Sequence, residues 1–176
     1  MNIKKEYYKN LANTVLKGFQ KRFIEGYYCE TKEEAKNIID NYLESIKNEE
    51  AKIEIAFYGG SFTAMDEKVQ EELLGVAHQY IKQGKVESIR ISTRPDAINK
   101  ETLKRLKKYK VKTIELGVQS ANNYILNRAN RGHNFESVKK ASKMIRWSGF
   151  NLGHQMMVGL PESTRIDEIN TAKALI

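Results

Sequence analysis

Cysteine and proline are scarce in this chain. One cysteine, Cys29, stands among 176 residues, which excludes a disulfide framework and fits a reducing compartment. A metal cluster held by thiolates would therefore find one ligand at most. The two prolines, Pro95 and Pro161, each follow an apolar run, so we expect them in loops after strands and predict no linker between domains.

Long apolar runs are missing as well. No stretch approaches the roughly 18 residues of a membrane span, and Met1–Lys5 is not followed by the apolar region of a signal peptide. We therefore expect a cytoplasmic chain without membrane contacts. With 176 residues and 40% hydrophobic content, the chain suits one domain with a sizeable core.

Acidic residues are outnumbered by basic ones. The chain has 30 Lys and Arg against 22 Asp and Glu, a formal net charge of +8, which favours anionic partners such as RNA. Many of the lysines, however, recur on predicted helix faces where they would face solvent: Lys104, Lys107, Lys108, Lys139, Lys140 and Lys143. The charge is therefore evidence about a partner and not about the fold.

Common catalytic motifs are also absent. The chain has no G-x-S-x-G elbow, no G-x-x-x-x-G-K-[ST] loop, no G-x-G-x-x-G and no H-E-x-x-H. Its three histidines, His78, His133 and His154, lack the spacing of metal ligands. We therefore predict no metal site from these residues.

The chain does contain a regular alternation of helix and strand patterns. Thr31 opens a capping box before a helix expected over 32–48. The following patterns predict strands at 52–58, 88–92, 113–118 and 152–158, and helices at 66–83, 99–108, 121–129, 134–148 and from about 163. This alternation predicts an α/β fold with a parallel sheet. Residues 1–30 lack a strand-length apolar run, and Ile176 is reached without a helix stop, so we expect an incomplete barrel.

The predicted strands carry large apolar side chains on one face and polar side chains on the other. Arg90 is expected between Glu54 and Glu115 on the polar face. Because parallel strands are ordinarily apolar on both faces, this stripe indicates a lumen that meets water or a ligand, or an internal ion-pair network. Both alternatives stay open.

Glycine or polar clusters follow each predicted strand, where parallel β/α folds bind ligands. Gly59-Gly60 would bring backbone close to a ligand, or would simply form a tight turn. Arg94 would bind a carboxylate or phosphate, or would pair with Asp96. His133 could serve as an acid or base, or as a turn residue.

Five ordered motifs together resemble the radical S-adenosylmethionine (SAM) superfamily, and most closely the branch of the Elongator catalytic subunit and oxygen-independent coproporphyrinogen III oxidase. They are Phe57–Ala64, Ile91–Asp96, Ile114–Ser120, Asn130–His133 and Gly153–Pro161. The resemblance implies a partial (β/α)6 TIM-like barrel of about four parallel strands with flanking helices. Residues 1–30 would form an atypical segment in place of the first strand and cluster loop, and 31–176 a barrel cut before its sixth strand.

The resemblance also implies the cofactors and their contacts. Members use SAM and a [4Fe–4S] cluster to make a 5'-deoxyadenosyl radical, and the resemblance leads us to expect that the intact enzyme acts on tRNA or a related substrate. The positions that match the family's SAM site are Gly59, Gly60, Ser61, Ser92, Arg94, Gln119, Arg131, Met157, Val158 and Gly159. Of these, Gly59, Gly60 and Ser61 match the motif that holds the amino group, and Met157, Val158 and Gly159 the segment beside adenine.

The chain departs from the family at the cluster. Members carry C-x-x-x-C-x-x-C, whereas the equivalent stretch, about residues 11–23, has no cysteine. We therefore expect the chain as written to be inactive in radical chemistry. Three alternatives stay open. The chain is part of a radical SAM enzyme that acts on tRNA or a related substrate, a non-catalytic barrel that binds SAM or RNA, or an interaction module with an empty rim.

Overall fold

The computed structural model describes residues 3–47, 51–58 and 60–176, which form two compact units, residues 1–51 and 52–176. The first unit contains helices α1 (Ile3–Gln20) and α2 (Lys32–Ser45). Helix α2 begins after Thr31, whose hydroxyl accepts a hydrogen bond from the Glu34 amide, as the capping box predicts. None of the described side chains of residues 6–47 is buried.

Helix α1 is an element that the sequence patterns above do not predict. Its apolar residues Leu11, Val15 and Phe19 recur every four positions, which is a helical spacing that could have revealed it. These side chains remain exposed. The division of the chain at residue 30 rests on the resemblance alone and stays a prediction.

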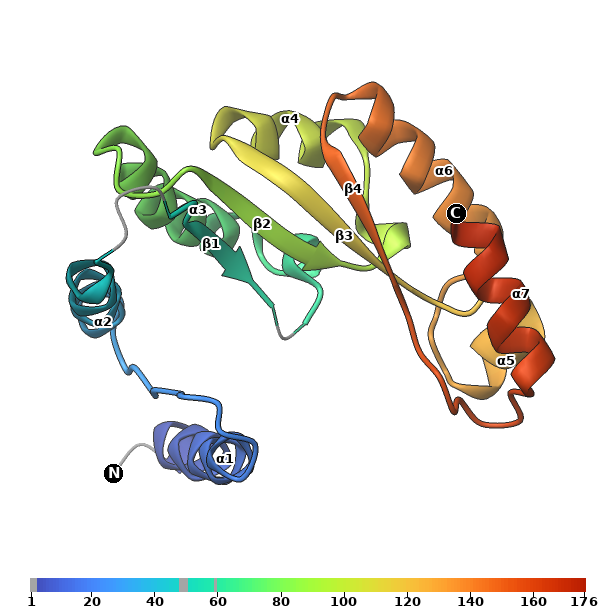
Figure 1. Ribbon diagram of the computed structural model, residues 1–176, viewed down its shortest axis with the longest axis horizontal. Coiled ribbons are helices and arrows are strands. Elements are labelled where there is room, and N and C mark those ends of the chain that lie inside the picture. The colour runs from blue at the N-terminus through green and yellow to red at the C-terminus, as the bar shows by residue number, and fades with distance from the viewer. Residues whose placement is uncertain (1–2, 48–50, 59) are drawn as a thin grey trace. The chain divides into compact units, whose positions relative to one another are not determined.

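The second unit is built on a parallel sheet with strand order β1-β2-β3-β4 (Figure 1). The strands are β1 (Glu54–Phe57), β2 (Ser88–Thr93), β3 (Val111–Gln119) and β4 (Asn151–Met156). The helices are α3 (Glu67–Lys82), α4 (Lys100–Lys108), α5 (Asn123–Arg128), α6 (Phe135–Trp147) and α7 (Arg165–Leu175), with short 3-10 turns η1 (Phe62–Ala64) and η2 (Pro95–Ala97). The predicted α/β architecture with four parallel strands and flanking helices is confirmed.

The core lies between one face of the sheet and helices α3, α4 and α6. Fully buried strand residues include Ile91 and Ile114, and they pack with helix residues such as Leu74, Leu106 and Ile145. Burial of these side chains leaves the opposite, polar face of the strands free for other contacts. Strand β4 ends two residues earlier than predicted.

Candidate ligand pocket at the carboxyl ends of the strands

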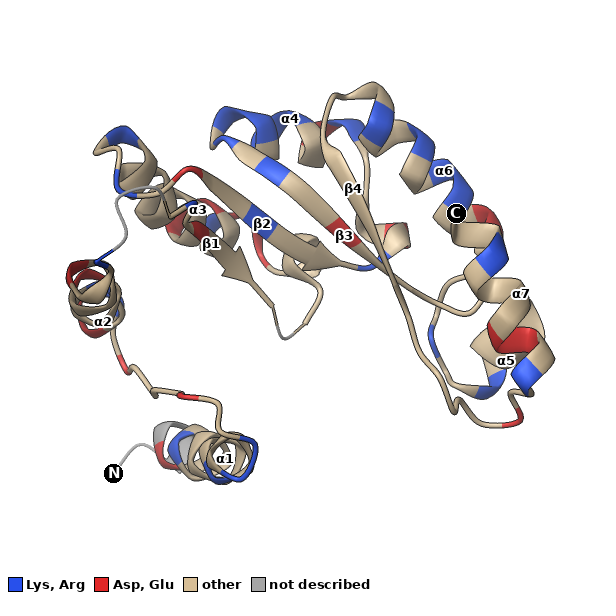
Figure 2. Ribbon diagram, viewed as in Figure 1, with Lys and Arg blue, Asp and Glu red and all other residues tan. Residues whose placement is uncertain are grey.

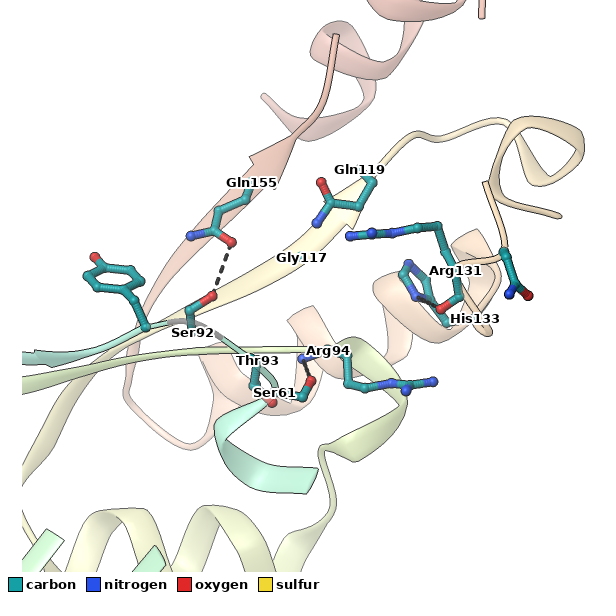
Figure 3. Close-up of a pocket in the computed structure, with 12 residues that line it drawn as sticks. Ser61, Ser92, Thr93, Arg94, Gly117, Gln119, Arg131, His133 and Gln155 are labelled. Carbon is teal, nitrogen blue, oxygen red and sulfur yellow. Dashed lines mark hydrogen bonds between the residues drawn. The ribbon is translucent and has the colours of Figure 1, made fainter. Parts of the chain in front are cut away.

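A pocket of about 480 Å³ opens at the carboxyl ends of the strands (Figure 3). Its lining comes from all four strand ends and from the loop after α5: Tyr58, Gly60, Ser61, Ser92, Thr93, Arg94, Gly117, Gln119, Asn130, Arg131, His133 and Gln155. Ligands of parallel β/α folds bind at this edge, because the loops after the strands converge there. The pocket is therefore the candidate functional site.

Six of the ten residues predicted for the site line this pocket: Gly60, Ser61, Ser92, Arg94, Gln119 and Arg131. Gly59 lies outside the described residues. Met157, Val158 and Gly159 are not among the lining residues, and the side chains of Met157 and Val158 are 45% and 71% exposed. Their predicted contact with adenine stays a prediction.

Gln119 enters the pocket through an irregularity at the end of β3. The register between β3 and β4 shifts between Gly117 and Gln119, and Gln119 has a φ of +69°. Such bulges redirect a side chain and recur beside active sites. Gln119 is only 8% exposed, and its amide forms no hydrogen bond with any described residue. An amide that lines a pocket and has no protein partner among the described residues is suited to a ligand.

Gly117 makes room for that amide. A Cβ atom at position 117 would lie 2.8 Å from Nε2 of Gln119 and 3.7 Å from the carbonyl oxygen of Thr93. Any other residue at 117 would therefore displace the Gln119 side chain. The local sequence Gly117-Val-Gln119 thus explains how a polar group is placed at this strand end.

The two arginines of the pocket differ in their partners. Nε of Arg94 lies 2.6 Å from Oδ1 of Asp96. Of the two alternatives predicted for Arg94, the structure therefore contains the ion pair with Asp96. Arg131 forms no ion pair within the described part of the chain, and its guanidinium points toward the Gln119 amide in Figure 3. The side chain available for an anionic ligand is therefore Arg131.

Two contacts hold the pocket walls in place. The backbone amide of Arg94 donates to Oγ of Ser61 at 2.9 Å, which joins the loop after β1 to the end of β2 (Figure 3). The His133 ring lies between two carbonyl oxygens, that of Val118 at 3.2 Å from Nε2 and that of Arg131 at 3.3 Å from Nδ1. His133 thus connects the loop that carries Arg131 to strand β3.

The floor of the pocket is a hydrogen-bonded network on the polar face of the sheet. Gln155 receives a hydrogen bond from the Ser92 hydroxyl at 3.1 Å and donates one to Glu115 at 2.6 Å. The Tyr58 hydroxyl also donates to Glu115, at 3.2 Å. Burial raises the pKa of Tyr58, and the neighbouring Glu115 carboxylate adds to the effect, which keeps the phenol protonated.

Arg90 continues this network and lies between two carboxylates, as predicted. Its guanidinium is 2.7 Å from Glu54 and 2.8 Å from Glu115. A hydrogen bond from Ser88 and those from Arg90 hold the pKa of Glu54 below its ordinary value. The ion-pair alternative for the polar face is therefore present in the structure, and it lies next to the pocket.

The lowered pKa of Glu54 predicts a loss of stability in acid. A carboxylate stabilised in the fold contributes above its ordinary pKa of 4.5, and the contribution disappears as pH falls through its lower folded value. We expect urea unfolding between pH 7 and 3 to show a steeper decline below pH 4.5 for the natural chain than for Glu54→Gln. Parallel pH profiles for the two proteins would contradict this role of Glu54.

Six pocket residues were outside the predicted site: Tyr58, Thr93, Gly117, Asn130, His133 and Gln155. All six lie within two positions of a predicted site residue, and Thr93 stands directly between Ser92 and Arg94. For Gly117 and Gln155, the alternation of the strands already places them on the polar face with Glu115. Extending that face to the strand ends would have identified both residues.

Metal ligands do not gather in the described part of the chain. Within residues 3–47, 51–58 and 60–176, no group of three His, Cys, Asp or Glu residues could hold a metal ion. Partial burial and the nearby Glu34 raise the pKa of Cys29, which disfavours the thiolate that binds metals. None of the described helices is long and apolar enough to cross a membrane.

Known proteins similar to this chain share its family. Residues 20–175 match the radical SAM superfamily. The tRNA uridine(34) acetyltransferase of Methanocaldococcus infernus is 27% identical over 139 residues, covering 69% of this chain and 26% of that protein. Human Elongator complex protein 3 is 28% identical over 127 residues, covering 62% and 23%. The chain thus spans about a quarter of the length of these two relatives.

Solved structures give the same picture. The Elp3 protein of Methanocaldococcus infernus, with residues 1–46 deleted, superposes with a TM-score of 0.67 at 26% identity, covering 76% of this chain and 35% of that one. The coproporphyrinogen III oxidase HemN of Escherichia coli, a radical SAM enzyme, shares the fold with a TM-score of 0.58 at 20% identity, covering 69% and 28%. The resemblance to the Elongator and HemN branch is confirmed, and the chain belongs to the radical SAM superfamily.

Proposed function

We propose that the pocket binds SAM and that the chain forms the SAM-binding part of a radical SAM enzyme acting on tRNA. The main observation behind this proposal is that one pocket contains both Arg131, which has no ion-pair partner among the described residues, and the side-chain amide of Gln119. SAM carries a carboxylate, an amino group and hydroxyl groups, which require such partners. The tRNA substrate is supported by the relatives named as tRNA uridine(34) acetyltransferases.

The pocket residues suggest a division of roles. Arg131 would bind the carboxylate of SAM, and Gly60 would offer exposed backbone to its amino group. Ser92 and Gln119 would contact the ribose hydroxyls or the amino acid moiety. Ser61 and Arg94 are placed to shape the wall, since they are joined to each other by a hydrogen bond. Met157, Val158 and Gly159 would contact the adenine ring.

The residues of this chain do not fit the [4Fe–4S] cluster of the family. Three thiolates hold that cluster, and the cluster supplies the electron that cleaves SAM. This sequence has only one cysteine. We therefore propose that this chain by itself binds SAM without generating the radical. Cluster ligands, if the intact enzyme has them, would come from outside these 176 residues.

A second candidate function is a barrel that binds SAM or RNA and has no radical chemistry. The cysteine count is the observation that favours it. A stretch of coding sequence adjoining this chain that encodes C-x-x-x-C-x-x-C would favour the enzyme. Its absence from the complete reading frame would favour the binding protein.

Arg131→Met is expected to weaken SAM binding by at least tenfold, because a charge-assisted hydrogen bond contributes about 1.5–3 kcal/mol. The matched control is Arg94→Met, which removes a cation that lines the same pocket but pairs with Asp96. We expect this control to change the affinity by less than threefold. Ligand-observed NMR measures both affinities.

Decarboxylated SAM tests which group Arg131 contacts. This analogue lacks the carboxylate, so the natural chain and Arg131→Met should bind it with equal affinity. A tenfold difference that persists with the analogue would contradict carboxylate binding by Arg131. If neither SAM nor the analogue binds at several millimolar, the proposed function is wrong.

A further inference from the structure

The positive charge of the chain is concentrated on two helices. Helices α4 and α6 together carry nine Lys and Arg against two Glu, a net charge of +7 in 22 residues. The whole chain has a formal net charge of +8, so the remaining residues are almost neutral as a group. A charge concentrated in this way creates a local field that a dispersed charge does not.

The two helices are neighbours on the same face of the sheet. Both bury apolar residues in the core, and Nζ of Lys107 in α4 donates to the carbonyl oxygen of Ser148 after α6 at 3.0 Å. Figure 2 shows basic residues along both helices. We define the basic face as six of the exposed basic residues of these helices: Lys104, Lys107, Lys139, Lys140, Lys143 and Arg146.

Part of this charge is not neutralised by neighbours. Lys139 pairs with Glu136 on the same helix, and on α4 Arg105 pairs with Glu67. Lys140, Lys143 and Arg146, in contrast, form no ion pair with any carboxylate of the described residues. These three cations lie within two turns of α6 and are available to an anionic partner.

An aromatic side chain lies at the end of the same helix. Trp147, the single tryptophan of the chain, is 78% exposed. Nζ of Lys143 lies 4.5 Å from the centre of its ring. Beside it is a hollow of about 420 Å³, lined in part by Lys139, Arg146 and Ser142. The basic face therefore combines free cations, an exposed indole ring and a depression next to it.

We propose that the basic face is an RNA-binding surface, in which Lys140, Lys143 and Arg146 contact phosphates and Trp147 stacks on a base. Surfaces that bind single strands combine these two elements, and stacking on an exposed ring is available to any base. An acidic protein would match the charge but would leave the indole ring without a planar partner. The proposal deepens the proposed function and rests on it, because it names a surface of this chain for the RNA substrate.

Charge-neutralising variants test the phosphate contacts. The triple variant Lys140→Gln, Lys143→Gln and Arg146→Gln is compared with Lys32→Gln, Lys47→Gln and Lys68→Gln, which lose the same charge elsewhere. Fluorescence anisotropy with a labelled tRNA transcript should show at least tenfold weaker binding for the first triple at 0.1 M salt. The slope of log K against log salt concentration should become shallower by about 2, since each phosphate contact contributes about 0.7–0.9. The control triple should change affinity by less than threefold.

The single tryptophan provides an independent readout of stacking. Binding of the transcript should quench Trp147 fluorescence, Trp147→Ala should weaken binding about tenfold, and Trp147→Tyr should retain most of the affinity. Unchanged fluorescence on saturation with RNA would overturn the stacking contact. Equal weakening by both triples, or equally tight binding of polyglutamate, would overturn the surface itself.

SAM binding distinguishes failure of this proposal from failure of the proposed function. SAM is titrated against the same variants by ligand-observed NMR, and both triples should retain the natural affinity. If both triple variants still bind RNA as tightly as the natural chain, and all three proteins bind SAM, then only the proposed RNA-binding surface is wrong.

Discussion

Valine at position 60 is expected to abolish detectable SAM binding. A Cβ atom at Gly60 would meet no other atom within 4 Å, and the residue lines the pocket, so the added methyl groups would occupy ligand space. The natural chain should bind SAM with a dissociation constant of about 1 mM, because the iron anchor of the family is missing. Gly60→Val should weaken this binding by more than tenfold. Ligand-observed NMR or calorimetry measures the loss.

The control for this variant is Gly84→Val. Gly84 also has a positive φ, +71° against +158° for Gly60, and a Cβ there would likewise meet no atom within 4 Å. It lies in the turn between α3 and β2 and does not line the pocket. Both variants should lose some stability through backbone strain, whereas only Gly60→Val should lose SAM. Equal affinities of the two variants would refute the role of Gly60.

Anaerobic reconstitution with iron and sulfide should leave the chain without a [4Fe–4S] cluster. Three thiolates normally hold such a cluster, and this sequence offers only Cys29, whose thiol has a raised pKa. The expected result is no cluster absorbance and no paramagnetic signal above background. Iron content should be the same for Cys29→Ser as for the natural chain.

The serine variant makes this prediction specific. If the natural chain retained stoichiometric iron and Cys29→Ser lost it, Cys29 would be a cluster ligand. If both retained iron, ligands other than cysteine would be responsible. Either result would show that the metal chemistry inferred from the cysteine count is wrong.

Much of the fold could be predicted because its signals are local. A capping residue and apolar spacing are properties of neighbouring residues, and they located α2 through α7 to within a few positions. Alternation along the strands also predicted that Arg90 lies between Glu54 and Glu115. Side chains on the same face of adjacent parallel strands lie close together, so the strand order is enough to predict such neighbours.

The finer geometry of the site depends on contacts that no local pattern records. The left-handed backbone at Gln119 follows from a register shift between two strands. The difference between Arg94 and Arg131 depends on which carboxylate lies within reach of each guanidinium. The motif at Met157 marks a strand end, but its sequence does not record that Met157, Val158 and Gly159 are not among the residues that line the pocket.

Gln119 also bears on how this protein could change under selection. A non-glycine residue in the left-handed region costs about 1–2 kcal/mol relative to ordinary backbone, and glycine would avoid that cost. Selection for folding stability alone would therefore replace Gln119 by glycine and erase the amide from the pocket. A chain that keeps glutamine here has a lower free energy of unfolding, and it therefore tolerates fewer other destabilising substitutions. A stabilised variant of this chain that is meant to keep its pocket should therefore retain Gln119 and carry its stabilising substitutions at other positions.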